Sequence, residues 1–251
     1  MSTLGLRTGH APDAIPSSHR DLVECPPVAA LTTVMPDGYP QTSVVWCDFD
    51  GACVRVKRPI RYVGECIPAR FAETEVPVLC RIRPTHVVAV DAGTPETRTG
   101  GDPAPVPALP GTLPIPADHL DLLARPICGV LTTMGSDGQP QSSLVWVDGD
   151  GACARVNTTL ERQKGRNLSA NPKVSLLVVD PRNTGRFLQI RGDAELVTGP
   201  EALEHLDALT QKYTRHPRFY GYVCPAAQQA RETRVMVRIH PRRVSCDAIH
   251  A

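Results

Sequence analysis

The strongest constraint on the fold is an internal repeat. Residues 19–56 align with residues 119–156 at a constant offset of 100 without a gap, and 21 of the 38 positions are identical. Self-similarity of this kind marks a duplicated structural unit. The chain is therefore expected to contain two copies of one fold.

The first copy is shorter than the second. After a break, residues 61–88 match residues 218–245 at an offset of 157, so the first copy lacks 57 residues. The missing part corresponds to about residues 158–215 of the second copy. Any function of this segment is therefore present only once per chain.

A Pro- and Gly-rich stretch separates the copies. Residues 93–116 contain seven Pro and four Gly with few apolar anchors, a composition typical of a semi-rigid exposed linker. The expected organisation is a flexible tail, a truncated copy, a linker and a complete copy, at residues 1–16, 17–92, 93–114 and 115–251.

Local patterns in the second copy indicate a mainly β fold with short helices. Apolar runs joined through Asp137-Gly138 and Asp150-Gly151 predict a three-stranded meander over 127–157. Thr158 and Glu161 have capping-box spacing before a helix to about residue 170. Further strands are expected at 174–179, 186–196, 234–239 and 244–248, and a second helix at 201–213. Antiparallel strands in this number favour a small closed barrel.

Composition excludes several classes of protein. With 27 Lys and Arg against 26 Asp and Glu, nothing in the overall charge attracts nucleic acid or an anionic membrane. No apolar run approaches the ~18 residues of a transmembrane helix, and residues 1–19 lack a signal-peptide pattern. The nine Cys show no CxxC spacing, so no metal site is expected. We expect a cytoplasmic protein without nucleic-acid or membrane partners.

The sharpest charge anomaly lies in residues 162–186, which hold six cations and one acid. Arg162 and Lys164 fall at the start of the predicted helix, where the helix dipole disfavours a cation. A phosphate would offset this cost, because it gains backbone N–H groups, the hydroxyls of Thr158 and Thr159, and both cations. A solvated basic face is the alternative, and charge alone does not decide between them.

No catalytic residue can be assigned from local patterns. Histidines are scattered, and no nucleophile–base pair or nucleotide-binding glycine motif occurs. Four aromatic residues surround residues 216–218, and they could either face a flat cofactor or cap the barrel end: Tyr213, Phe219, Tyr220 and Tyr222.

Several segments of the second copy together resemble a known family. They are Leu131-Thr132-Thr133, Asp137-Gly138-x-Pro140-Gln141, Val145-Trp146, Arg162-Gln163-Lys164-x-Arg166-Asn167-Leu168, Asn171-Pro172-Lys173-Val174-Ser175 and Arg191-Gly192-x-Ala194-Glu195. Over about residues 120–246, the chain resembles the pyridoxamine 5'-phosphate oxidase-like split-barrel flavoproteins, in particular their flavin/deazaflavin oxidoreductase branch. The resemblance implies an FMN-binding split β-barrel preceded by a truncated repeat, with FMN or coenzyme F-420 bound at a dimer interface.

Residue by residue, the resemblance implies a cofactor site in the second copy alone. It implies that the cofactor phosphate is held by Thr158, Thr159, Arg162 and Lys164, and that Gln141, Ser143, Trp146 and Asn157 lie beside the ring. The first copy has Arg58-Pro59-Ile60-Arg61 in place of the phosphate-binding helix, so no cofactor is expected there. The family's Trp-containing C-terminal signature is missing from residues 237–243, which argues against oxidation of vitamin B6.

The expected function is an oxidoreductase that uses coenzyme F-420 or FMN for hydride transfer to a small organic substrate. The six cations favour F-420, because its phosphate and oligoglutamate tail are more negative than FMN. The alternative is a non-catalytic or haem-binding carrier or sensor, with His216, His240 or His250 as the axial ligand. A homodimer is expected, although the first copy could instead replace a partner subunit.

Overall fold

The structure is a computed structural model that describes residues 15, 19–24, 28–50, 53–58, 78–82 and 110–246. The chain divides into two compact units: an N-terminal unit of residues 1–31 and 44–94, and a C-terminal unit of residues 32–43 and 95–251. The expected tail, apart from Ile15, and the linker up to residue 109 lie outside the described residues. Within the described ranges, no helix is long and apolar enough to cross a membrane.

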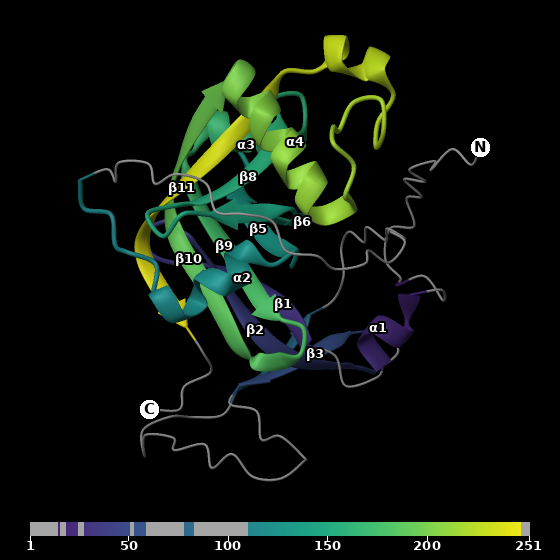
Figure 1. The fold of residues 1–251 in the computed structure, drawn as a ribbon. Coiled ribbons are helices and arrows are strands. Elements are labelled where there is room, and N and C mark those ends of the chain that lie inside the picture. The colour runs from purple at the N-terminus through teal and green to yellow at the C-terminus, as the bar shows by residue number, and fades with distance from the viewer. Residues whose placement is uncertain are drawn as a thin grey trace. The chain divides into compact units, whose positions relative to one another are not determined.

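An antiparallel sheet forms the body of the C-terminal unit (Figure 1). Its seven described strands are β5 (Gly129–Met134), β6 (Pro140–Val145), β7 (Val147–Gly149), β8 (Ala154–Thr159), β9 (Lys173–Asp180), β10 (Asn183–Thr198) and β11 (Arg234–Cys246). The order in the sheet is β6-β5-β9-β10-β11-β8-β7. The end strands β6 and β7 are separated in the chain by Trp146 alone. The sheet must therefore curl until its two ends meet at this residue, which confirms the expected mainly β, split-barrel fold.

The interior of the curled sheet is aliphatic. Its core includes Leu131, Val156, Leu176, Ile190 and Val237, all of them fully buried. Burial of each such side chain contributes about 1.5–3 kcal/mol relative to exposure. Because these residues come from β5, β8, β9, β10 and β11, the core joins strands that are far apart in the sequence.

Three helices pack against the sheet: α2 (Leu120–Ala124), α3 (Gln163–Ala170) and α4 (Pro200–Thr214). The 3-10 helix η2 (Ala117–His119) precedes α2, and η3 (Ala226–Arg231), which has no buried residue, lies between α4 and β11 in the chain. Helix α4 packs against β8, β10 and β11 and agrees with the predicted helix 201–213. It begins with Pro200 in the first turn, where a missing N–H costs nothing. It ends at Arg215, whose φ of 65° breaks the helical path.

The capping box predicted before helix α3 was wrong, and the predicted meander is confirmed except for one interruption. Helix α3 begins at Gln163 with Arg162 as its N-cap, and Thr158 forms no capping box. The Glu161 carboxylate accepts the backbone N–H of Thr233 instead, at 2.9 and 3.1 Å. Strand β5 pairs with β6 and β7 pairs with β8, as expected at the two Asp-Gly turns, but Trp146 separates β6 from β7, so β8 does not pair with β6.

The last two predicted strands are one continuous strand, β11. Its partner β10 shifts register between Arg191 and Gly192, and this bulge lies opposite Pro241, which has no N–H to donate. A Cβ at Gly192 would lie 2.1 Å from the His240 carbonyl oxygen. Gly192 is therefore paired with Pro241 at the bulge, and the ladder of β10 and β11 continues to Cys246.

A second sheet contains the repeated sequence. Its described strands run in the order β1 (Val28–Val34), β2 (Pro40–Phe49), β3 (Val54–Arg58) and β4 (Val78–Ile82), after α1 (Asp21–Glu24). The pair Cys47–Val56 of β2 and β3 corresponds to Val147–Val156 of β7 and β8. The pair Val54–Ile82 of β3 and β4 likewise corresponds to Ala154–Ile239 of β8 and β11. Both ladder registers thus follow the offsets of 100 and 157 found in the sequence.

Candidate functional site

The start of helix α3 is held tightly against the end of β8. A Cβ at Gly165 would lie 2.1 Å from the carbonyl oxygen of Thr159 and 2.9 Å from Cα of Leu160. Only glycine allows the helix backbone to approach these atoms so closely. The first turn of α3 is consequently fixed relative to the strand that carries Thr158 and Thr159.

Lys164, in this first turn, is a cation without a counter-ion. Its side chain is half-buried and has no acidic partner among the described residues. Burial, and then the charge of Arg162, lowers the pKa of Lys164 to about 8. Arg162 is exposed at the N-cap position. Two cations at a helix N-terminus repel each other and the positive end of the helix dipole, unless an anion lies between them.

The end of β8 supplies polar groups beside these cations. Thr158 and Thr159 are each 1% exposed. The Thr158 hydroxyl has no hydrogen-bond partner in the described part of the chain, which is costly for a buried polar group. The side chain of the N-cap residue Arg162 makes no capping hydrogen bond to the N–H groups at the start of α3. A buried hydroxyl, free helix N–H groups and an unneutralised lysine are together the components of an anion site.

Three of the other four cations of the basic segment have partners, and the fourth, Arg182, is exposed. Arg186 pairs with Asp121 and Asp180, at 2.5 and 3.4 Å. Lys173 donates to the carbonyl of Asp37. Arg166, on α3 itself, donates to Gln163 at 2.7 Å. Arg162 and Lys164 therefore remain at the start of α3 without a side-chain partner among the described residues, a charge suited to a phosphate group.

Two of the residues expected beside a cofactor ring lie on β6. The amide oxygen of Gln141 accepts a hydrogen bond from Asn167 of α3 at 3.2 Å, and Asn167 also donates to Thr133 at 3.0 Å. Ser143 is two residues further along β6, hence on the same face as Gln141. The structure thus brings Gln141 into contact with the helix that carries Lys164.

The other two expected ring residues lie against α4 and the loop after it. The Trp146 indole stacks on Tyr213 with ring centroids 5.2 Å apart and meets the edge of Phe219 at 6.3 Å. Asn157 donates to the Ala202 carbonyl at 2.8 Å. Its amide oxygen is buried without a partner among the described residues.

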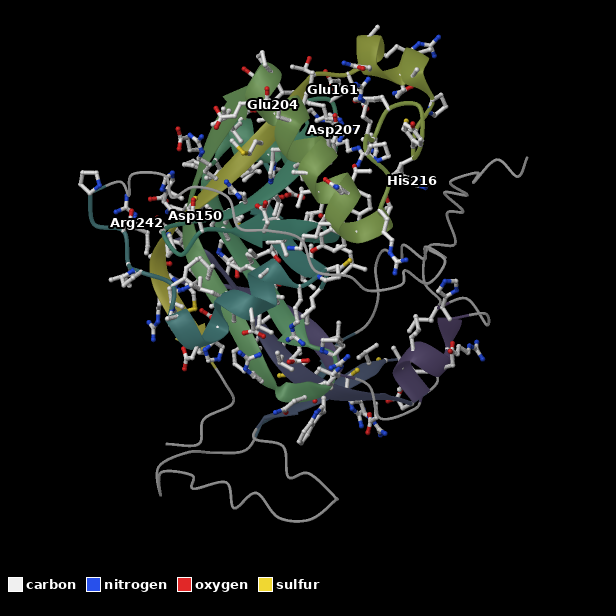
Figure 2. The ribbon with its side chains drawn as sticks, viewed as in Figure 1. Asp150, Glu161, Glu204, Asp207, His216 and Arg242 are labelled. Carbon is white, nitrogen blue, oxygen red and sulfur yellow. The ribbon has the colours of Figure 1, made fainter. Side chains whose placement is uncertain are left out.

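The aromatic cluster is partly core and partly surface. Tyr213 is 2% exposed and donates to the carbonyl of Ile127 at 2.7 Å, whereas Tyr222 is 58% exposed. The guanidinium of Arg234 lies 4.6 Å from the centre of the Phe219 ring. Asp207 of α4 accepts the Phe219 backbone N–H at 2.8 Å, which ties this loop to the helix (Figure 2). Tyr213 and Phe219 therefore pack around Trp146, whereas Tyr222 lies at the surface.

Of the three candidate haem ligands, two lie in the described residues. His240 is buried and hydrogen-bonded to Glu195 at 2.9 Å. His216 is exposed beyond the end of α4, where it stacks on Tyr222 (Figure 2). His250 lies outside the described residues.

Sequence reasoning missed a buried polar network beneath α4. Asp148 accepts hydrogen bonds from Arg155 at 2.9 Å and from His205 at 3.1 Å. Burial alone would raise the pKa of Asp148, but the hydrogen bonds and charges of His205 and Arg155 outweigh it and lower the pKa to about 2. The repeated pair Asp48 and Arg55, 100 residues earlier, was the signal that could have revealed it.

Arg191, which belongs to one of the segments that resemble the family, is a buried cation of β10. It is 7% exposed, and its Nε and one Nη have no partner among the described residues. It lies on β10 at the bulge, between Gln189 and Asp193 on one face of the strand. Among the described residues, Arg191 has no acidic partner, as is also true of Lys164, but it lies on β10 and not at the start of α3.

The curled sheet, whose edge strands β6 and β7 are joined at Trp146 without pairing and which carries a basic helix after β8, defines the C-terminal unit as a split-barrel protein. Residues 115–246 match the family model described as pyridoxamine 5'-phosphate oxidase, and the chain belongs to this family.

Solved structures with the same fold resemble about half of the chain. An F420 reductase is 35% identical, with 52% of this chain and 98% of that one covered and a TM-score of 0.45. A conserved hypothetical protein from Mycobacterium tuberculosis is 28% identical, with 57% and 89% covered and a TM-score of 0.44. HutZ, the heme storage protein from Vibrio cholerae, is 17% identical, with 51% and 90% covered and a TM-score of 0.40. No curated protein matches the sequence.

Proposed function

We propose that the C-terminal unit binds a flavin-type redox cofactor, FMN or coenzyme F-420, through a phosphate at the start of α3, and acts as an oxidoreductase on a small organic substrate. The observation that carries this proposal is Lys164, a half-buried cation without an acidic partner among the described residues. Membership of the pyridoxamine 5'-phosphate oxidase family supports a flavin-type cofactor.

The residues present fit a phosphate. Lys164 would form a charge-assisted hydrogen bond to it, and the orphaned hydroxyl of Thr158 would donate a second. The uncapped N–H groups of α3 point toward the helix N-terminus and favour negative charge there. Thr159 and Arg162 complete the expected phosphate anchors.

The proposed ring environment contains Gln141, Ser143, Trp146 and Asn157. The amide of Gln141 is oriented by its bond to Asn167, and Trp146 is fixed by its stack on Tyr213. When bound, the cofactor ring supplies the hydride chemistry. The chain's residues position the ring, exclude water from it and neutralise the phosphate, so the proposal requires no acid–base residue.

Two cations at the α3 start suit either cofactor. The preference for F-420 inferred from six cations is weaker, because Lys173 and Arg186 bind elsewhere. Titration of the full chain with FMN and with F-420, followed by the fluorescence of each compound, distinguishes them. Micromolar binding of FMN without binding of F-420 would assign the flavin, and the reverse result would assign the deazaflavin.

The absorption spectrum of the purified protein tests the class of function. A flavin or deazaflavin band supports the oxidoreductase proposal. A Soret band would instead support the alternative, a haem-binding carrier or sensor. Hydride transfer is then tested by mixing the protein with reduced cofactor and an organic acceptor, and absence of turnover with the cofactor bound would leave a non-catalytic carrier.

A further inference from the structure

A cluster of four hydroxyl groups lies where the β1–β2 hairpin meets the β5–β6 hairpin. Residues 32–43 belong to the C-terminal unit, so both hairpins lie in one compact body. Thr32 bonds Thr42 at 2.9 Å, and Thr132 bonds Ser142 at 2.8 Å, each pair within its own hairpin. Thr42 and Thr132 are completely buried. The cluster is thus an internal polar contact whose hydroxyls find their partners in one another.

The contacts between the hairpins are reciprocal. Thr32 and Thr42 are the repeat equivalents of Thr132 and Ser142 at the offset of 100. The bond from Thr32 to Ser142 is 3.2 Å, and its counterpart from Thr42 to Thr132 is 3.0 Å. The equivalent residues Thr32 and Thr132 contact each other at 3.3 Å. Reciprocal pairs around a self-contact are the signature of a two-fold interface between identical subunits.

We propose that the hairpin of residues 32–43 occupies, within the same chain, the surface on which the 132–143 hairpin of a second copy would pack in a homodimer. The chain is then a monomer that carries its own dimer contact. This inference concerns assembly and does not depend on the proposed cofactor.

Further contacts distinguish this hairpin from that of a second copy. The Tyr39 hydroxyl donates to Asp193 at 2.6 Å, and the Gln41 amide donates to Gln189 at 3.1 Å. Lys173 lies 5.0 Å from the centre of the Tyr39 ring. The residue equivalent to Tyr39 in the second copy is Gln139, which has no phenol to offer. The surface of β9 and β10 is therefore matched to the 32–43 hairpin.

The oligomeric state of the full chain is the first test. Sedimentation velocity from about 1 to 100 µM should give one species with the mass of a single chain, 27.1 kDa. A dimer, whether its fraction is constant or rises with protein concentration, would overturn the proposal and support the homodimer expected from the sequence.

The docking of the hairpin is tested by Tyr39→Phe, with Gln139→Ala at the equivalent exposed position as the matched control. Loss of the bond to Asp193 should lower the Tm by roughly 2–6 °C, and the control should leave it unchanged. Phenylalanine keeps the ring, so the variant should fold. Equal Tm values for the two variants would contradict the docking even if the chain is a monomer.

Discussion

At the scale of single residues, the anion site depends on Lys164. Lys164→Gln should weaken the affinity for whichever of FMN and F-420 binds by about 1.5–3 kcal/mol, roughly 10- to 150-fold, because a charge-assisted hydrogen bond is lost. Isothermal titration calorimetry measures this change. Arg182→Gln removes an exposed cation of the same basic segment and should leave the affinity unchanged. Equal affinities for Lys164→Gln and the wild type would remove Lys164 from the site.

The same lysine predicts a pH dependence of binding. The pKa of Lys164 in the free protein is about 8, and the anion binds the protonated form. Above about pH 8, the logarithm of the affinity should therefore fall by up to about one per pH unit. Titrations between pH 7 and about 10 test this, since the cofactor phosphate is already ionised there. A variant lacking Lys164 should lose this slope, and persistence of the slope would assign it to another group.

The Asp148 network predicts a contrast between the two copies. The folded pKa of Asp148 is about 2, below the ordinary 3.8. Asp148 thus stabilises the fold fully above about pH 4, and this contribution is lost as the pH falls toward 2. Asp148→Asn should cost at least about 2 kcal/mol at pH 7, measured by urea unfolding. Asp48→Asn, in an exposed pair, should cost little, and equal losses would contradict this account.

At the scale of elements, the close approach of α3 to β8 makes Gly165 irreplaceable. Alanine normally stabilises a helix relative to glycine. Here, the added Cβ would meet backbone at 2.1 Å, so Gly165→Ala should destabilise the protein by about 1–3 kcal/mol and weaken cofactor binding. Thermal unfolding with Glu204→Ala, an exposed change on α4, is the control. A stabilising effect of Gly165→Ala would show that the helix is free to move away from the strand.

Local signals predicted most elements and the pairings of adjacent strands, but not the long-range pairings β5–β9 and β8–β11. Helix α4 and the hairpin at Asp137-Gly138 were predictable, because helical periodicity and turn chemistry are local. The interruption of the meander coincides with a tertiary contact: Trp146 stacks on Tyr213, 67 positions along the chain, and it separates strands β6 and β7. The capping box failed because Glu161 binds Thr233, a partner that no local pattern could indicate.

At the scale of the whole molecule, the repeat and the motifs predicted the family and the split-barrel class. The segment that contains Thr158, Arg162 and Lys164 could be chosen as a candidate anion site from the sequence, because its charge is anomalous in a neutral chain, and phosphate binding there stays a prediction. The network around Asp148 could not be predicted, because His205 contacts Asp148 from a helix 57 residues away in the sequence. The contact between Thr32 and Thr132 could not be predicted either, because a repeat predicts two copies of a fold but not how the hairpin of one copy packs against that of the other.

A crystal structure of the full chain grown with FMN or F-420, whichever the titration selects, tests the proposed anion site. We predict a phosphate oxygen about 2.7–3.2 Å from Nζ of Lys164 and from backbone N–H groups at the start of α3. A phosphate bound elsewhere with Lys164 facing solvent, or a cofactor that leaves the Thr158 hydroxyl and the helix N-terminus uncontacted, would contradict this prediction.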